Sequence, residues 1–229
     1  MRIVYVVISC IAVGLFGAMA IAKLPHALYG KRIAGQVVDA ETGAPIPGAH
    51  VAFLWESTII PSGFTGHNAR DICYHAAAAV TDRDGKFDVP GWRKWSTYHV
   101  RISDPIVLVY VSEYEADQFT LKPQIRPPID RPNERFRLKR FKGSIDERIL
   151  SMWGGFANRG CLYGGESQKS LYPMLKALYE EGRSIARTPG QIDTLHFLAV
   201  KAADAALAFD PNGPARDREV QKFIKENLQ

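Results

Sequence analysis

Three side chains able to bind a metal ion recur at four-residue intervals: His67, Asp71 and His75. Imidazole and carboxylate groups are common zinc ligands, and on a helix this spacing would place all three on one face. Two glycines, Gly63 and Gly66, and the strand-like residues that follow argue against a helix at this point. These residues allow two interpretations. In the first, the three side chains bind the metal ion of a metal-dependent hydrolase. In the second, which we favour, they are polar residues of a loop and a strand edge.

The run Asp82-x-Asp84-Gly85 has the first ligands of a calcium-binding loop, but the later ligands, including the distal glutamate, do not follow. A hairpin turn with Gly85 in the left-handed conformation explains the run better. The chain also has no Ser-His-Asp spacing, no phosphate-binding glycine loop and no paired carboxylates. We therefore predict a protein that is not an enzyme, with no catalytic residues, no metal and no cofactor.

Trp92, Trp95 and Tyr98 lie close together, directly after a Pro-Gly pair. An exposed aromatic strip of this kind could stack on a sugar ring or anchor a partner protein. The alternative is an apolar rim packed under neighbouring helices. These three residues and His67, which lies in a long glycine-containing loop expected at 57–73, form the predicted binding surface.

The first residues of the chain predict export from the cytoplasm. Between Arg2 and Lys23, the run Ile3–Ala22 contains no charge. Small residues at 18–22 fit a signal-peptidase site, whereas the length of the run just suffices to span a bilayer. Residues 1–22 are therefore a cleaved signal peptide or a retained membrane anchor. In both cases we expect the rest of the chain in the periplasm, free or attached to the membrane through residues 3–22.

Two of the three cysteines, Cys73 and Cys161, lie outside this apolar segment, and Cys10 lies within it. In an oxidising compartment the natural interpretation is a disulfide between Cys73 and Cys161. The bond would close a long loop, which the chain-entropy model values at about 4 kcal/mol. The alternative is a pair of unpaired, buried thiols.

The formal net charge is +5, and the basic residues concentrate between Lys122 and Lys142. In an exported protein this pattern does not indicate nucleic acid, so an anionic lipid or polysaccharide surface is the more suitable partner. The alternative is a solvated strand face together with a proline-rich loop at 122–133. An envelope protein or glycan is the expected partner in general.

Period-two alternation of apolar residues predicts strands between Lys31 and Phe141, separated by turn residues. The residues at 24–30 read as a connector. Seven short strands suggest an antiparallel β-sandwich over residues 31–143. The predicted strands are 33–39, 49–55, 75–81, 86–89, 97–102, 106–111 and 134–141.

From residue 144 to residue 229 the apolar period changes to that of helices. Leu171, Leu175, Leu178 and Ile185 form one stripe, with Ser170 as its expected N-cap. A second helix opens at Thr188-Pro189, and a short charged helix ends the chain. We expect about three helices that form a C-terminal tail packed on the sandwich, because they are too few for a core of their own.

Two turn-rich runs carry a family resemblance. They are Gly35-x-Val37-x-Asp39 continued by Thr42-Gly43-x-Pro45-Ile46-x-Gly48-Ala49-x-Val51, and Thr81-Asp82-x-Asp84-Gly85-x-Phe87. Both runs resemble the carboxypeptidase regulatory-like domain, directly over about a quarter of the chain and, through the strand pattern, over about half. The resemblance implies a transthyretin-like (prealbumin-like) β-sandwich.

The same resemblance implies a noncatalytic module, appended to enzymes, receptors and adhesins or standing alone in exported bacterial proteins. No peptidase domain accompanies it here, and the helical tail is not part of the family pattern. The sequence therefore predicts a disulfide-linked binding or structural module of the bacterial cell envelope.

Overall fold

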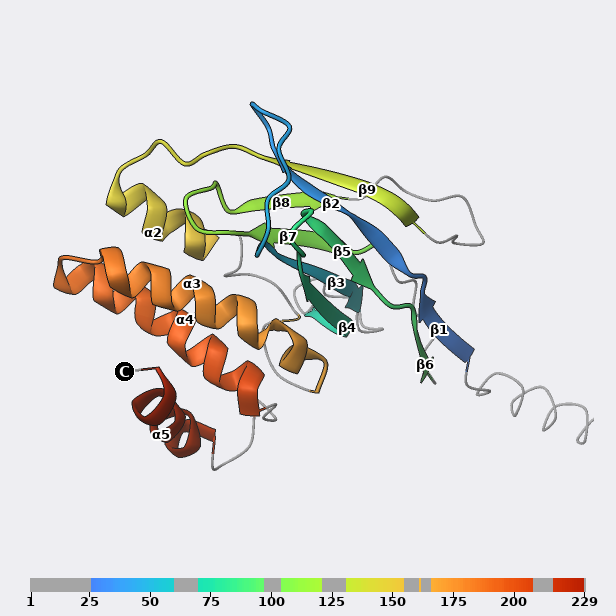
Figure 1. Ribbon diagram of the computed structural model, residues 1–229. Helices are drawn as coiled ribbons and strands as arrows, with labels where there is room; N and C mark the ends of the chain where they lie inside the picture. The colour runs from blue at the N-terminus through green and yellow to red at the C-terminus, as the bar shows by residue number, and fades with distance from the viewer. Residues whose placement is uncertain are drawn as a thin grey trace, which may run out of the picture.

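The computed structural model describes residues 26–59, 70–96, 104–120, 131–154, 161, 166–207 and 216–228. Over these ranges strands and helices take up roughly equal numbers of residues, so the fold is mixed. Figure 1 shows two sheets stacked above a layer of helices. The expected signal or anchor segment at 3–22 lies outside the described ranges, and no helix within them is long and apolar enough to cross a bilayer.

A four-stranded antiparallel sheet forms the middle layer. Its strand order is β4-β3-β7-β8, and the pairing is continuous along β3 except for an irregularity at Trp55 and Glu56. The strands are β4 (Arg70–Val80), β3 (His50–Ile59), β7 (Ile106–Tyr110) and β8 (Asp117–Thr120).

A three-stranded sheet lies over one face of the middle layer. Strand β2 is central in it, antiparallel to β5 and parallel to β9. Two further strands, β1 and β6, form a separate antiparallel ribbon. The strands are β5 (Lys86–Val89), β2 (Ile33–Asp39), β9 (Arg131–Leu138), β1 (His26–Gly30) and β6 (Trp92–Ser96).

Helices cover the other face of the middle layer (Figure 1). They are α2 (Ile145–Gly154), the 3-10 helix η2 (Glu166–Leu171), α3 (Tyr172–Ile185), α4 (Pro189–Leu207) and α5 (Arg216–Asn227).

Strand β3 shows why the middle sheet is buried on both sides. Val51, Phe53 and Trp55 point into an apolar cluster shared with β2, β5, β7 and β9, which lies between the two sheets. Ala52 and Leu54 point the opposite way, into a second cluster shared with the helices. Because successive residues of a strand face opposite sides, the apolar run 51–55 can serve both clusters.

A buried polar network fixes the helices on the sheet. Arg148 of α2 donates to both carboxylate oxygens of Glu181 on α3, at 2.8 and 3.1 Å, and to the carbonyl of Tyr114. Tyr110 of β7 donates its hydroxyl to the same carboxylate, and burial, then this carboxylate, raises the pKa of Tyr110. A buried ion pair with several hydrogen bonds adds more to geometric specificity than to net stability.

The structure corrects several details of the sequence prediction. Strands β1, β6 and β8 were not predicted. All three are short, and the residues of β1 and β6 were interpreted as a connector and an aromatic strip. The pairing of β2 with β9 is parallel rather than antiparallel. Helix α2 was also missed, and Ser170 caps no helix, because its hydroxyl donates to the carbonyl of Ala76 at 3.1 Å. The predicted strand 97–102 lies outside the described residues.

Two predicted loops are partly strand. Residues 57–59 and 70–73, expected in a loop, extend β3 and β4, and β9 begins at Arg131 inside the expected proline-rich loop. The helices are also more than a slight tail. They supply most of the cluster on the lower face of the middle sheet, including Leu175, Leu178, Leu195 and Leu198, each nearly or fully buried.

The two turns that carry the family resemblance lie against each other. The hydroxyl of Thr81 donates to the carbonyl of Ile46 at 2.7 Å and accepts the N–H of Ala49 at 2.8 Å. Gly85 has φ +70°, and its carbonyl accepts the N–H of Val37 at 2.8 Å. A Cβ atom at Gly85 would lie 2.6 Å from the carbonyl oxygen of Val37.

The structure predicts different costs for two glycines with the same backbone conformation. Gly43 also has positive φ (+72°), but a Cβ atom there would meet no atom within 4 Å. Gly43→Ala should lower the free energy of unfolding by about 1 kcal/mol, from the left-handed conformation alone. Gly85→Ala should lower it by about 3 kcal/mol, because overpacking is added. Urea unfolding measures both, and equal costs would show that the turns do not pack as described.

Candidate functional site

The ribbon of β1 and β6 has one exposed face and one buried face. Directly opposite residues of an antiparallel pair share a face, and the ribbon pairs Ala27 with Trp95 and Tyr29 with Arg93. Trp95 is 66% exposed and Tyr29 is 44% exposed, whereas Leu28 on the other face is buried. The ribbon lies at the end of the sheets remote from α2 (Figure 1).

The exposed face combines aromatic rings with positive charge. The guanidinium carbon of Arg93 lies 4.9 Å from the centre of the Trp95 ring, a cation–π contact. Beside it is a hollow of about 500 Å³ lined by Tyr29, Gly30, Lys31 and Arg93, among others. Neither strand contains an acidic residue. We call this surface, formed by Tyr29, Lys31, Arg93 and Trp95, the ribbon face.

The chemistry of the ribbon face suits binding rather than reaction. Exposed aromatic rings pack on the apolar C–H face of a sugar or on an apolar side chain. Guanidinium and ammonium groups bind carboxylate, sulfate or phosphate. The groups of this face are therefore able to contact a ligand that has an apolar ring face and a negative charge.

The buried face of the ribbon packs on the middle sheet through aromatic rings. Trp92 contacts Trp55 edge to face at 5.5 Å and His75 at 4.8 Å between ring centres. Gly30 permits this, because a Cβ atom there would lie 2.1 Å from Nε1 of Trp92. Neither that Nε1 nor Nδ1 of His75 has a hydrogen-bond partner among the described residues. Burial, then the charge of Lys94, lowers the pKa of His75 from 6.5 to about 4.

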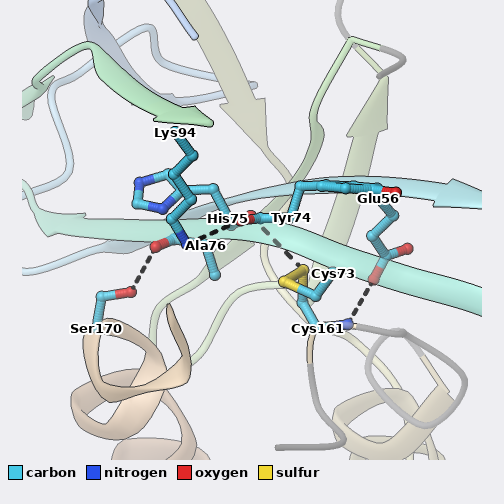
Figure 2. Close-up of a disulfide and its surroundings, with 8 residues drawn as sticks. All are labelled: Glu56, Cys73, Tyr74, His75, Ala76, Lys94, Cys161 and Ser170. Atoms are coloured by element: carbon cyan, nitrogen blue, oxygen red, sulfur yellow. Dashed lines mark hydrogen bonds between the residues drawn. A yellow bond between two sulfur atoms is a disulfide. The ribbon is translucent and has the colours of Figure 1, made fainter. Parts of the chain in front are cut away.

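Next to this aromatic cluster, a disulfide joins the middle sheet to the helical layer (Figure 2). Cys73 of β4 and Cys161, which lies between α2 and η2, have an S–S distance of 2.10 Å and Cα atoms 4.5 Å apart. The expected pairing of Cys73 with Cys161 is therefore confirmed. The buried carboxylate of Glu56 accepts the N–H of Cys161 at 2.8 Å, which holds this strand of backbone against β3.

Side chains also close part of the edge of β4 beside the disulfide. Lys94 donates its ammonium group to the carbonyl of Tyr74 at 3.0 Å, and Ser170 donates to the carbonyl of Ala76 (Figure 2). These bonds tie the ribbon on one side and η2 on the other to the same strand. The disulfide therefore lies where the middle sheet, the ribbon and the helical layer meet.

The predicted binding residues do not form one surface. Trp92 and Trp95 lie on opposite faces of the ribbon, because an odd number of positions separates them along a strand. Tyr98 and His67 lie outside the described residues. Asp71 lies in β4, but only its backbone is described, so the His67, Asp71 and His75 set is not tested. No group of three or more His, Cys, Asp or Glu side chains suited to a metal is found within the described ranges.

Sequence reasoning missed Tyr29, Lys31, Arg93 and Glu56. Tyr29 lies in the stretch interpreted as a connector, Lys31 directly follows that stretch, and Arg93 lies between the two tryptophans on which the prediction rested. The alternation of Trp92, Arg93, Lys94 and Trp95 was the available signal, since it divides the run between two faces of a strand. Nothing near Glu56 in the sequence indicates that its carboxylate would meet Cys161.

The described residues of the basic stretch between Lys122 and Lys142 also do not form one surface. Arg135 and Arg137 of β9 and Lys139, one residue past its end, occupy alternate positions and are exposed. Arg140 lies 3.6 Å from Asp39, and Lys142 lies 3.1 Å from Glu41, so these two are paired within the fold.

Loss of the disulfide should lower stability without a change of fold. The bond closes a loop with a sequence separation of 88. The free energy of unfolding of the doubly substituted Cys73→Ser, Cys161→Ser protein should be about 4 kcal/mol lower than that of the oxidised protein. Urea unfolding measures this difference. The reduced unsubstituted protein is the matched control and should behave as the variant does. A loss below about 1 kcal/mol would contradict a structural role for the bond.

The buried His75 should make stability depend on pH. The folded protein keeps this side chain neutral down to about pH 4, whereas the unfolded chain protonates it near pH 6.5. The unfolded state therefore binds more protons in this interval, and the free energy of unfolding should fall as pH falls from 6.5 toward 4. His75→Gln should remove this part of the slope, and Lys94→Gln should reduce it. Parallel slopes for all three proteins would contradict the burial of His75.

Comparison with known proteins assigns no family. No protein-family description matches the chain, and no curated protein matches it. Among solved structures, the chain is similar to a 3-chlorocatechol 1,2-dioxygenase from Rhodococcus opacus 1CP, with 14% identity and a TM-score of 0.29. The match covers 52% of this chain and 61% of the dioxygenase chain, and at this level of similarity it carries no argument about fold or activity.

Proposed function

We propose that this protein is an exported, noncatalytic binding module of the bacterial cell envelope, and that the ribbon face binds an anionic saccharide. The proposed architecture is a transthyretin-like sandwich of the carboxypeptidase regulatory-like kind, carrying a helical layer on one sheet. The proposed location is the periplasm, after passage through the membrane by means of residues 1–22.

Two features support the sandwich. Side chains from the three-stranded and four-stranded sheets share one apolar cluster, with Phe53, Phe87 and Phe136 within 6.5 Å of one another between ring centres. The turns that carry the family resemblance hydrogen-bond to each other through Thr81. The parallel pairing of β2 with β9 and the ribbon of β1 and β6 are departures from the expected seven antiparallel strands.

The disulfide supports export. Structural disulfides persist in oxidising compartments and are rare in the cytosol. Cys73 and Cys161 are bonded across two layers of the fold rather than within a loop. This agrees with the apolar start of the chain, which is followed at once by a lysine.

The observation that carries the proposed function is the exposed Trp95 ring with Arg93 over it. Trp95 is 66% exposed, and with Tyr29, which is 44% exposed, it gives this face two accessible aromatic rings beside positive charge. The cationic neighbours and the absence of acidic residues in β1 and β6 favour a negative ligand. A saccharide that bears carboxylates has both required surfaces, an apolar ring face and an anion.

A second candidate surface is the outer face of β9. Arg135, Arg137 and Lys139 are exposed at alternate positions, the first two in β9 and Lys139 one residue past its end. Such a row could bind an anionic lipid or polysaccharide without aromatic stacking, and its binding would be sensitive to salt.

Trp95→Ala should weaken binding of a carboxylated saccharide by about tenfold, the effect of losing roughly 1.4 kcal/mol of aromatic contact. Arg93→Ala should weaken it by a similar factor and reduce its dependence on salt. Titration of the full chain with oligogalacturonate, followed by calorimetry, measures both effects. A neutral glucan of the same length is the control ligand and should bind much more weakly.

The doubly substituted Arg137→Glu, Lys139→Glu protein distinguishes binding by the ribbon face from binding by the outer face of β9. If the ribbon face binds the saccharide, this variant should retain nearly all of the affinity. If it alone loses affinity while Trp95→Ala does not, the outer face of β9 is the binding surface instead. Equal affinity in all proteins, or no binding at all, would contradict the proposed ligand.

A further inference from the structure

We propose that the free edge of β4 is a docking site for an extended segment of a partner polypeptide. The segment would add a strand beside Ala78 and Val80 and place an acidic side chain against Arg135. This site is separate from the ribbon face and is independent of the proposed saccharide ligand.

Near its C-terminal end, β4 presents backbone groups on the side away from β3 that have no partner among the described residues. Among the described strands β4 is the edge of its sheet. The N–H of Thr81, just past its end, donates to the carbonyl of Ala49 at 2.9 Å. Because alternate residues of an antiparallel strand bond to the same neighbour, Ala77 and Ala79 face β3, and Ala78 and Val80 face the open side.

Toward the N-terminal end of β4, hydrogen bonds from side chains cover the same edge. The carbonyl of Ala76, which has the same orientation as those of Ala78 and Val80, accepts the hydroxyl of Ser170, and that of Tyr74 accepts the ammonium group of Lys94 (Figure 2). Such side-chain caps block pairing with another strand. No described side chain caps Ala78 or Val80 in this way, so pairing is possible only at this end of the strand.

A cleft of about 590 Å³ begins at this open end. Residues of β4, β5, β2 and β9 line it, and several of them have a small side chain or none. Val80, at its rim, is 52% exposed. The small residues that line it are Ala34, Gly35 and Ala79. An extended segment can therefore pair with β4 and continue into the cleft.

Most charges that line the cleft are already paired. Arg32 donates to both carboxylate oxygens of Asp88, at 2.8 and 2.6 Å. The carboxylate of Asp82 accepts two backbone N–H groups of its own turn, from Asp84 and Lys86, at 2.9 Å each.

One cationic side chain of the cleft has no charged partner among the described residues. Glu134 interacts within the fold, and Lys86 contacts Asp84 at 3.4 Å. Arg135 is exposed and makes no ion pair with any described residue. A partner segment that carries a carboxylate opposite Arg135 therefore complements the cleft.

The test uses the isotopically labelled full chain and a synthetic peptide. The probe is a blocked five-residue peptide of alternating valine and threonine with one glutamate, compared with the same peptide carrying lysine instead. The glutamate peptide should shift the backbone amide resonances of Ala78 and Val80, and it should bind at least tenfold more tightly than the lysine peptide. A version with N-methylated alternate amides should not bind.

Two substitutions test the strand geometry. Val80→Pro removes an N–H that faces the open side, where edge positions tolerate proline, so the melting temperature should change little while peptide affinity falls at least tenfold. Ala79→Pro removes an N–H that faces β3 and should lower the melting temperature strongly. Arg135→Glu should reverse the preference between the two peptides. Arg137→Glu, on the same strand but outside the cleft, is its matched control and should preserve the preference.

Unchanged resonances at Ala78 and Val80, or full affinity in Val80→Pro, would overturn the proposal. So would a concentration-dependent dimer that Val80→Pro abolishes, since a second copy would then be the occupant. Trp95→Ala should bind the peptide as the unsubstituted protein does, which keeps this result separate from that for the saccharide.

Discussion

The four-stranded sheet is covered on both faces, and the rest of the structure depends on this double burial. Burial of an apolar side chain contributes roughly 1.5–3 kcal/mol, and β3 buries side chains toward both clusters. One face meets the three-stranded sheet and the other meets the helices. Neither outer layer has another described apolar layer to pack on, so each depends on the middle sheet for its position.

The sequence allowed part of this arrangement to be predicted. Strands were predicted at 49–55 and 106–111, and the structure has β3 and β7 there. In both strands successive apolar residues alternate between the two clusters. The three helices predicted after residue 170 were also located correctly.

What could not be predicted depends on contacts between distant segments. Strand β8 is too short for its periodicity to be recognised, and β1 becomes a strand because β6 pairs with it. The ribbon face appears only when Tyr29 and Arg93 are brought opposite each other by that pairing. Glu56 and Cys161 meet across 105 positions of sequence, which no local pattern can indicate. The disulfide was an exception, because the number of cysteines outside the apolar segment left a single pair.

The parallel partnership of β2 and β9 has a consequence for how the chain acquires its structure. One strand lies near the start of the described residues and the other near residue 138, yet they are neighbours in register from Val37 with Phe136 to Asp39 with Leu138. Contacts between residues so far apart in sequence raise the contact order and slow the search for the native state. During synthesis, β2 has no partner on its β9 side until about a hundred further residues have been added. Until then, its N–H and C=O groups on that side are exposed to other chains. A chaperone would be most useful to this protein during that delay.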